Sequence, residues 1–394
     1  MKFLILNTDY PEFLRWHYAQ HPGLERESYQ EQIRVRMDSL FGVADFYSHN
    51  LRNLGHEAWD IHASNRFMQE AWAKEHRVRA GGLLPCSGRR AGFHRVVARL
   101  AVRSPLRYLK SSFRSEPLSA ERQPDWFYEI LRAQIDHYKP DVLLNQAMDA
   151  GIGHFLKEMK PSVRLLVGQH AATPLPDSAG LDGYDLVVSS FPPTVDRFRQ
   201  QGIPAELNRL AFEPRVLARL KREKRCHGVT FIGGLYRIHS SRVGFLECVC
   251  AQLPETSIWG PGVDRLSPAS VIRRCYMGQA WGREMYEILH NSRIALNHHG
   301  DIPPFANNLR LFEATGVGAL LITDWKANLR DMFEPGKEVM TYRTPEDCAE
   351  LIRYYLDHED ERATIARAGQ ERTLQAHTYP KRMQELVEIV RKHL

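Results

Sequence analysis

Short, continuously apolar runs alternate along the chain with segments whose apolar residues recur at helical spacing, which indicates strands alternating with helices. Helical spacing of apolar residues predicts helices at 31–54, 126–138 and 193–201, and over most of 345–394. Strands that alternate with helices are typical of parallel sheets covered by helices on both faces. Short, continuously apolar runs predict the strands, at residues 2–7, 57–61, 141–146, 164–169, 184–190, 205–210, 228–232, 256–259, 294–297, 319–323 and 339–342.

The chain of 394 residues is longer than the roughly 250–300 residues that one hydrophobic core usually serves. A charged, helix-prone stretch at 212–226 separates the two series of strands, and we interpret it as a connection between domains. The pattern therefore predicts an α/β protein with two doubly wound, Rossmann-like domains, at 1–212 and from 213 onward. Ligands of such sheets bind at the carboxyl ends of the strands, so we expect the active site in a cleft between the two halves.

Composition fits a soluble globular protein, with 43% hydrophobic and 25% charged residues. The longest apolar runs, such as 316–322, are far shorter than the roughly 20 residues that cross a bilayer, so no transmembrane helix is expected. The apolar start of the chain is too short for a signal peptide and is interpreted as the first strand. Six cysteines without a CxxC pair indicate reduced thiols and a cytoplasmic protein.

The net charge of +6 is concentrated in one segment. Residues 77–114 contain ten basic side chains and no acidic one, so the remainder of the chain is net negative. Within the segment, an apolar stripe of Phe93, Val96, Val97 and Leu100 accompanies arginines at every fourth position. This pattern predicts either a basic amphipathic helix on an anionic surface, such as a membrane, or a solvated helix packed on its own domain. The arginines are Arg95, Arg99, Arg103 and Arg107.

The segment 291–324 carries the most informative chemistry. Its strand ends at His298, and a helix is predicted to begin near Asn307 or Asn308, with Asn308 as a capping residue. A helix N-terminus attracts phosphate, and Arg310 adds a bidentate ligand for an anion. Glu313, one turn further, can accept hydrogen bonds from the hydroxyls of a ribose. Together these residues predict a nucleotide site, while an ordinary capped helix with a surface arginine remains the alternative.

The motif Asn-x-Arg-x-Phe-Glu-Ala-x-Gly-x-Gly-Ala-x-Leu-Ile-Thr-Asp, at residues 308–324, resembles the C-terminal domain of group 1 glycosyltransferases. It is most similar to their CgeB-like, spore-maturation-type branch, and the segments 329–338, 352–358, 365–372 and 377–382 agree with that branch in the same order. The resemblance is strong over about 284–386. It implies a GT-B fold, with an acceptor domain at 1–212, a nucleotide-sugar domain at 213–376 and a last helix, 377–394, that crosses back to the first domain.

The chain departs from the group 1 pattern at one position. Retaining members carry a second glutamate eight residues before the ribose-binding one, and here that residue is Phe305. This leaves the donor sugar, and retention or inversion of the anomeric centre, open. The resemblance also gives His170, at the end of a strand, a role in sugar contact or proton transfer. Asp9, at the end of the first strand, is expected to face the cleft and is a second candidate catalytic residue beside His170.

Gly233 and Gly234 follow the first strand of the second domain and let the backbone approach a ligand, although no full GxGxxG pattern is present. Arg237 and His239 in the same loop are suited to bind a diphosphate. We therefore expect a donor nucleotide-sugar site made of Gly233, Gly234, Arg237, His239, His298, Asn307, Asn308, Arg310 and Glu313.

These residues predict a glycosyltransferase that moves a sugar from a nucleoside-diphosphate sugar to an acceptor hydroxyl in bacterial glycan or glycoconjugate synthesis. No carboxylate pair typical of a metal site accompanies the diphosphate residues, so we expect a metal-independent reaction with the sugar nucleotide as co-substrate and no further cofactor. We expect a cytoplasmic enzyme. Peripheral attachment to the inner face of the membrane is the further option that the basic segment raises. The acceptor is left open among a lipid-linked glycan, a polysaccharide, a protein and a small molecule.

Three alternatives remain from the sequence. One is a GT-B sugar-nucleotide epimerase or hydrolase, which would consume donor without an acceptor. Another is a GT-B scaffold that binds a sugar nucleotide without turnover. The third is a nucleic-acid or membrane-binding protein that acts through residues 77–114, although aromatic residues are sparse there and no nucleic-acid motif is present. The sequence holds no GxSxG, HExxH or Walker pattern, which gives no support to serine hydrolases, zincins or P-loop enzymes.

Overall fold

The structure is a computed structural model of residues 1–394, and it describes all of them except 82–122, 147, 149–150, 171–180, 182, 222–225, 237–239 and 300–304. The four stripe arginines, Arg95, Arg99, Arg103 and Arg107, lie outside the described residues. The chain divides into two compact units. One contains Met1–Arg36, Ala58–Gln169 and Pro176–Tyr184, and the other contains Met37–Glu57, His170–Leu175 and Asp185–Leu394. The predicted domain boundaries are untested and stay predictions.

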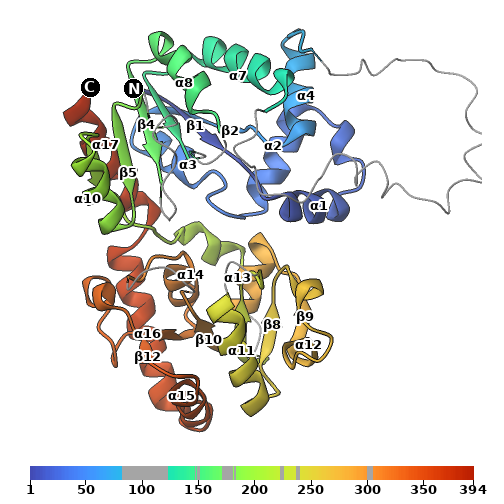
Figure 1. Cartoon of the computed structure of the whole chain (residues 1–394), viewed down its shortest axis with the longest axis vertical. Coiled ribbons are helices and arrows are strands. Elements are labelled where there is room, and N and C mark those ends of the chain that lie inside the picture. The colour runs from blue at the N-terminus through green and yellow to red at the C-terminus, as the bar shows by residue number, and fades with distance from the viewer. Residues whose placement is uncertain are drawn as a thin grey trace, which may run out of the picture. The chain divides into compact units, whose positions relative to one another are not determined.

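The first sheet has six strands in the order β2-β1-β3-β4-β5-β6 (Figure 1). The chain runs from β1 to β2 on one side and then returns to β3 on the other, so its strand order reverses between β1 and β3. These two strands are parallel, with Leu4 opposite Leu143. Every apolar side chain of β1 from Phe3 to Leu6 is fully buried. The strands are β1 (Lys2–Asn7), β2 (Glu57–His62), β3 (Val142–Asn145), β4 (Leu165–Gln169), β5 (Leu186–Ser189) and β6 (Ala205–Leu207).

Helices follow most of these strands, as the alternating pattern predicts. In the unit that begins with Met1, Met68 and Trp72 of α4 pack with Tyr29 and Ile130 in one buried cluster. The helices of this half of the chain are α1 (Pro11–Gln20), α2 (Tyr29–Asp38), α3 (Phe46–Asn53), α4 (Arg66–Glu75), α7 (Asp125–Tyr138), α8 (Gly153–Met159) and α10 (Pro192–Gln200).

The prediction of one long helix over 31–54 is wrong. Two helices, α2 and α3, occupy this segment, and the backbone between them takes positive φ angles at Leu40, Gly42 and Ala44. Such angles do not continue a right-handed helix. The connection at 212–226 also differs from the helix-prone pattern, since its described part forms a 3₁₀ helix at Pro214–Arg219.

The second sheet is parallel throughout and has the order β12-β11-β10-β7-β8-β9. The chain passes from β7 to β9 on one side and returns to β10 on the other, so the reversal falls between β7 and β10. The sequence missed β9, a strand of only three residues. The strands are β7 (His227–Ile232), β8 (Ser257–Trp259), β9 (Tyr276–Gly278), β10 (Ser292–Asn297), β11 (Leu320–Asp324) and β12 (Met340–Tyr342).

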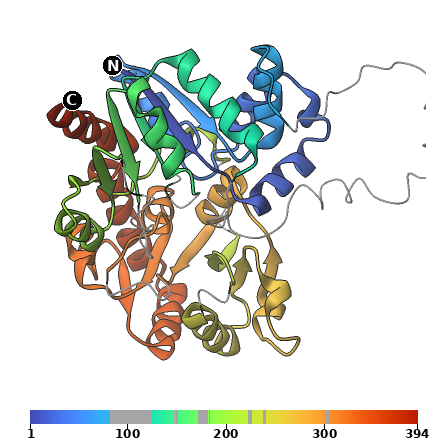
Figure 2. The ribbon, with the colours of Figure 1, turned by 45° about the horizontal axis from the view of Figure 1, so that its top comes forward.

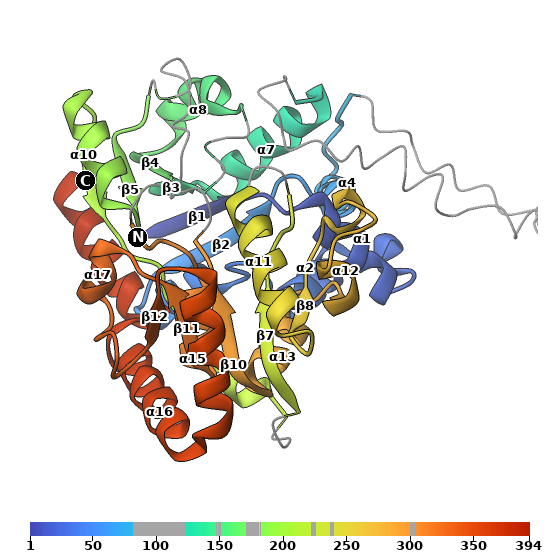
Figure 3. The same cartoon turned by 60° about the horizontal axis from the view of Figure 1, so that its bottom comes forward.

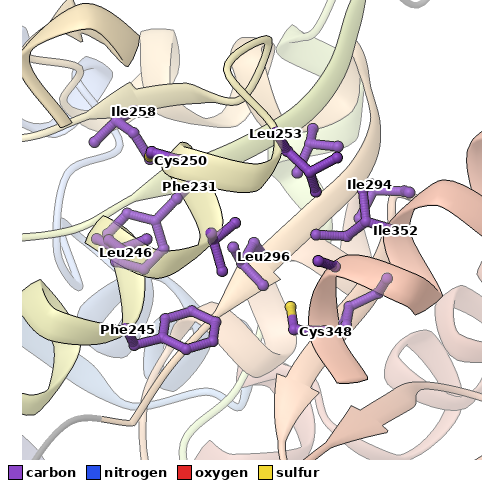
Figure 4. Close-up of a cluster of buried hydrophobic side chains, with 14 of the residues drawn as sticks. Phe231, Phe245, Leu246, Cys250, Leu253, Ile258, Ile294, Leu296, Cys348 and Ile352 are labelled. Carbon is purple, nitrogen blue, oxygen red and sulfur yellow. The ribbon is translucent and has the colours of Figure 1, made fainter. Parts of the chain in front are cut away.

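Helices cover both faces of this sheet (Figures 1 and 3). α11 and α15 pack together on one face, and their side chains form a core with Phe231, Ile294 and Leu296 of the strands (Figure 4). α13, α14 and α16 pack against the strands from the other face. The helices are α11 (Ser240–Gln252), α12 (Ile272–Cys275), α13 (Gly282–His290), α14 (Arg310–Gly316), α15 (Pro345–Asp357), α16 (Glu359–Ala376) and α17 (Tyr379–His393).

The last helix, α17, lies beside α3 and α10 within the same compact unit (Figure 2). The ring of Tyr379 lies 5.2 Å from that of Phe46 and 5.6 Å from that of Tyr47, which belong to α3. Near α10, the side-chain amide of Asn208 donates to the carbonyl of Arg382 at 3.3 Å. Among the helices that the structure describes, none is long and apolar enough to span a bilayer.

Candidate functional site

The reversal of strand order between β7 and β10 places two loops next to each other at the carboxyl edge of the second sheet. The first loop follows β7 and contains Gly233 and Gly234, and the second follows β10 and begins with His298. The helices after these strands lie on opposite faces, α11 on one and α14 on the other. Such a point forms the crevice in which open α/β sheets bind ligands.

Arg310 opens α14 and reaches into this crevice. Its Nη2 donates to the carbonyl of Ile232, the last residue of β7, at 3.3 Å, and its Nη1 lies 2.8 Å from Oε2 of Glu313. Its Nε is buried and has no hydrogen-bond partner in the described part of the chain. A buried donor without a partner is costly, so this guanidinium is poised to accept an anion. The predicted pair of Arg310 and Glu313 is thus brought together at the end of β7.

Glu313 is 6% exposed. Burial raises the pKa of its carboxyl group, while the charge of Arg310 and a hydrogen bond from Tyr286 oppose the shift. Burial also raises the pKa of Tyr286 well above its usual value, so its hydroxyl stays protonated and donates. A carboxylate held in this way can exchange its arginine partner for ligand hydroxyls.

Asn308 does not cap α14, so this part of the prediction is wrong. The helix begins at Arg310 after Leu309, without a side-chain cap. Instead, Asn308 pairs with Asn297 at the end of β10: Nδ2 of Asn308 donates to Oδ1 of Asn297 at 2.9 Å. Nδ2 of Asn297 donates in turn to Oγ1 of Thr323 at 3.0 Å. These amides fix the loop before α14 to the strand ends, with half-buried Asn307 beside them.

The glycines after β7 allow a close approach of two backbone segments. A Cβ at Gly260, whose φ is +137°, would collide with the carbonyl of Gly233. A Cβ at Gly234 would lie 2.8 Å from the ring of Tyr236. The backbone at Gly233 is therefore approached closely by Gly260, which must be glycine, and a side chain at Gly234 would require the ring of Tyr236 to move. Arg237 and His239, predicted to bind a diphosphate, lie outside the described residues.

Arg242 is a residue of this crevice that sequence reasoning missed. Its Nη1 donates to the carbonyl of Gly234 at 3.1 Å, and its Nη2 donates to the carbonyl of His298 at 3.2 Å. The same guanidinium thus joins both loops and adds a positive charge between them. Its position, eight residues after the double glycine and in the first turn of α11, was the signal that could have identified it.

His298 and His299 lie next to Asp324, at the end of β11. Nδ1 of His299 is 2.6 Å from Oδ1 of Asp324, and Nδ1 of His298 is 3.9 Å from Oδ2. Burial lowers the pKa of His298 to about 4, so its imidazole is neutral at pH 7. Burial opposes ionisation of Asp324, but His299, His298 and Lys326 outweigh it and hold the pKa of this carboxyl far below its usual value.

His170 and Phe305 belong to the same compact unit as this crevice. The backbone amide of His170 donates to Val188 of β5 at 3.1 Å, and its buried ring lies edge-on to Phe198, with centroids 6.4 Å apart. Phe305 lies edge-on to Phe191, just after β5, at 5.7 Å. Phe305 therefore takes part in an aromatic contact between the loop before α14 and the end of β5.

Asp9, at the end of β1, is buried inside an ionic cluster of the other unit. Its Oδ1 lies 2.6 Å from Nη2 of Arg36, and its Oδ2 lies 3.0 Å from Nδ1 of His62. The side chains of Arg36 and Asp9 are only 3% and 1% exposed. Burial opposes ionisation of Asp9, yet Arg36 and His62 outweigh it and hold the pKa of Asp9 far below its usual value. Asp9 is thus placed as an internal counter-ion.

This cluster predicts a loss of stability in mild acid. Burial lowers the pKa of His17 from 6.5 to about 3 and also lowers the pKa of His62. The unfolded chain therefore binds protons at these groups below about pH 6.5, whereas the folded chain does not, so the free energy of unfolding falls as pH drops toward 3. We expect urea midpoints to decrease steadily from pH 7 to pH 4. A replacement of His17 by Gln should flatten this dependence, and an equally steep dependence in that variant would contradict the assignment.

Within the described residues, no three His, Cys, Asp or Glu side chains are grouped as ligands for a metal ion. The site combines cationic and amide donors, Arg310 and Arg242 above all, with the buried carboxylates of Glu313 and Asp324. This arrangement can hold a diphosphate and accept hydrogen bonds from adjacent hydroxyls.

Comparisons with known proteins agree with this description. Residues 242–388 match a family model described as "Glycosyl transferase-like". No match was found among curated proteins. Solved structures similar over the whole chain include Anabaena HepE in complex with UDP-glucose, with 12% identity, a TM-score of 0.60 and complete coverage of both chains.

Two further solved structures show the same likeness. Sucrose-phosphate synthase from Thermosynechococcus elongatus is 11% identical, with a TM-score of 0.57 and coverage of 100% of this chain and 99% of that one. A glycosyltransferase from Rickettsia africae is 11% identical, with a TM-score of 0.56 and coverage of 100% and 98%. The chain has the GT-B fold, and the predicted α/β fold with two parallel sheets is confirmed.

Proposed function

We propose that this protein is a glycosyltransferase that moves a sugar from a nucleoside-diphosphate sugar to an acceptor hydroxyl. The observation that carries the proposal is the buried pair of Arg310 and Glu313 at the end of β7, with one arginine donor unfilled. The family-model match covers the same elements, and Anabaena HepE, of the same fold, is known in complex with UDP-glucose. Uridine diphosphate is therefore the first nucleotide to test.

In the proposed reaction, the diphosphate lies against the amides of Gly233 and Gly234. Arg310 turns from Glu313 to the phosphate oxygens, and Glu313 accepts the ribose hydroxyls. The acceptor oxygen forms a bond to the anomeric carbon as the bond from that carbon to the phosphate oxygen breaks. The acceptor loses its proton to a base, for which we propose His170, and the nucleoside diphosphate leaves with its charge balanced by Arg310. His298, Asn307 and Asn308 line the same loops.

Release of nucleoside diphosphate from a panel of sugar nucleotides tests this function. The panel is incubated with and without extracts that contain lipid-linked glycans, polysaccharides and small acceptors, and the label of the sugar is followed. Transfer of label to an acceptor supports the proposal. Release of free sugar at the same rate without any acceptor would instead establish a hydrolase, and an altered sugar on intact nucleotide would establish an epimerase. Bacterial glycan or glycoconjugate synthesis, and the CgeB-like branch, remain part of this proposal.

We further propose that turnover needs no divalent metal and no cofactor besides the donor. Arg310 and Arg242 supply positive charge where a metal would otherwise balance the diphosphate. Exhaustive treatment with EDTA is expected to leave most of the activity. Loss of activity that Mn²⁺ or Mg²⁺ restores, with no restoration by Ca²⁺, would contradict this expectation.

Finally, we propose that residues 77–114 attach the protein to an anionic membrane surface that carries the acceptor. The support is the ten basic side chains without an acidic one, each contributing on the order of 1 kcal/mol near an anionic bilayer. Wild type is expected to co-sediment with anionic vesicles at low salt and to be released at high salt. Replacement of Arg95, Arg99, Arg103 and Arg107 by Ser should abolish sedimentation.

A matched variant controls for total charge in this experiment. Replacement of four exposed arginines elsewhere by Ser removes the same charge and is expected to leave sedimentation unchanged. Equal sedimentation of the stripe variant and wild type would exclude the membrane role. The four control residues are Arg274, Arg330, Arg353 and Arg367.

A further inference from the structure

A cavity of about 420 Å³ lies between α11 and α15, beside the carboxyl ends of β10, β11 and β12. Figure 3 shows these two helices over the same sheet. Arg310 and Glu313 are not among the residues that line the cavity, and only His298 is shared with the proposed donor residues. Its volume lies in the range of small-molecule sites, which is about 300–1,000 Å³.

Four of the eleven residues that line the cavity are aromatic. The rings of Phe245 and Tyr342 are stacked, with centroids 4.9 Å apart and planes 7° from parallel. His298 meets Phe245 edge-on at 4.8 Å. Trp325, which is 37% exposed, forms a further part of the lining. Such faces favour a flat, apolar body in the ligand.

The charged side chains that line the cavity have a net positive charge, because Lys326 and Arg343 outnumber Asp324. Asp324 is matched by Lys326, whose Nζ lies 3.2 Å from Oδ2, and also accepts from buried His299. His298 is neutral at pH 7 because burial lowers its pKa to about 4. Arg343 lies over the ring of Trp325, with Cζ 4.3 Å from the centroid, and makes no ion pair with a carboxylate in the described part of the chain. One fixed positive charge is therefore left for a ligand.

We propose that this cavity is a second small-molecule site, separate from the donor site, for a compound that joins one flat ring to one anionic group. The anion pairs with Arg343, which Trp325 holds in place, and the ring packs against the aromatic walls. A carboxylate and a phosphate both have the required charge, and the test distinguishes them. The charge of Asp324 is already balanced by Lys326, and its carboxylate faces the polar edge of the ligand.

Cys248 provides a direct readout, because it lines the cavity and its thiol is exposed. Cys250, Cys275 and Cys348 are buried. A protein with Cys86 and Cys226 replaced by Ser therefore reports the labelling of Cys248 alone by a thiol reagent. The probes are 4-hydroxybenzoate, phenyl phosphate and, as a neutral control, 4-hydroxybenzyl alcohol.

We expect one anionic probe to slow the labelling of Cys248 and the neutral probe to leave it unchanged. Arg343→Gln should weaken this protection at least about tenfold. Arg274→Gln, an exposed arginine outside the cavity, should preserve it. Labelling that neither anion slows, or protection equal in Arg343→Gln and wild type, would overturn the proposal. Displacement of the probe by saturating uridine diphosphate would also overturn it, since the cavity would then belong to the donor site.

Discussion

Replacement of Asp9 by Ala is expected to lower the free energy of unfolding by about 3–5 kcal/mol, the usual cost of removing one partner of a buried ion pair. The variant leaves the buried guanidinium of Arg36 without its carboxylate. It also leaves Nδ1 of His62 without the oxygen 3.0 Å away. Water cannot readily reach either buried group to replace the lost carboxylate. The free energy of unfolding therefore falls by more than it would on removal of a surface ion pair. Urea denaturation at pH 7 measures the change.

An exposed pair on the same unit provides the control. Glu70 lies 2.6 Å from Arg66 across one turn of α4, with both side chains partly in solvent. Replacement of Glu70 by Ala should leave the unfolding transition almost unchanged, because exposed ion pairs contribute little. Similar losses from both replacements would show that the cluster around Asp9 is solvated, which contradicts its assignment as an internal counter-ion. Retention of stability in Asp9→Ala would have the same meaning.

Arg310→Ala is expected to weaken binding of a nucleoside diphosphate by about 1.5–3 kcal/mol, the range of hydrogen bonds to charged groups. The loss corresponds to about ten- to 160-fold in the dissociation constant. The reason is that Arg310 lies at the end of β7, where its buried Nε has no hydrogen-bond partner among the described residues. Isothermal titration calorimetry of the folded variant measures the effect.

Removal of Arg310 also leaves buried Glu313 unpaired, so stability must be recorded beside affinity. Arg283 provides a matched control, because its Nε lies 2.9 Å from Glu287 in an exposed pair on α13 of the same unit. Arg283→Ala should bind the nucleotide as wild type does. A folded Arg310→Ala protein with unchanged affinity would place the diphosphate elsewhere.

Apolar runs predicted most strands because parallel strands covered on both faces are buried throughout. β1, β7, β10 and β11 lie within about two residues of their predicted bounds. The period of apolar residues could not reveal the break between α2 and α3, because Leu40 and Ala44 are residues common in helices and nothing in their type indicates the positive φ angles that they adopt. The sequence did not predict β9 because three residues are too few to show a period, and the apolar side chain of Met277 is exposed.

The sequence could place neighbouring residues of one helix together, while the roles of these residues in binding a nucleotide stay predictions. Arg310 and Glu313 are one turn apart, and their pairing follows from helical spacing alone. The partners of Asn308 and Arg242 come from other strands and loops, so the sequence could not place them: Asn308 pairs with Asn297 instead of capping a helix. Asp9 was expected in the cleft because it ends a strand. The structure shows that it is buried instead, because Arg36 of α2 donates to its carboxylate.

The most direct test of the central claim, that the crevice between β7 and β10 binds a sugar nucleotide, is the thermal unfolding of the wild-type protein with nucleoside diphosphates. Uridine, guanosine, adenosine and thymidine diphosphates are each added at millimolar concentration, with and without EDTA. The proposed function predicts that at least one of them raises the unfolding temperature, and that Arg310→Ala loses most of this increase whereas Arg283→Ala retains it. If none of the four raises the unfolding temperature of the wild type, the claim is contradicted.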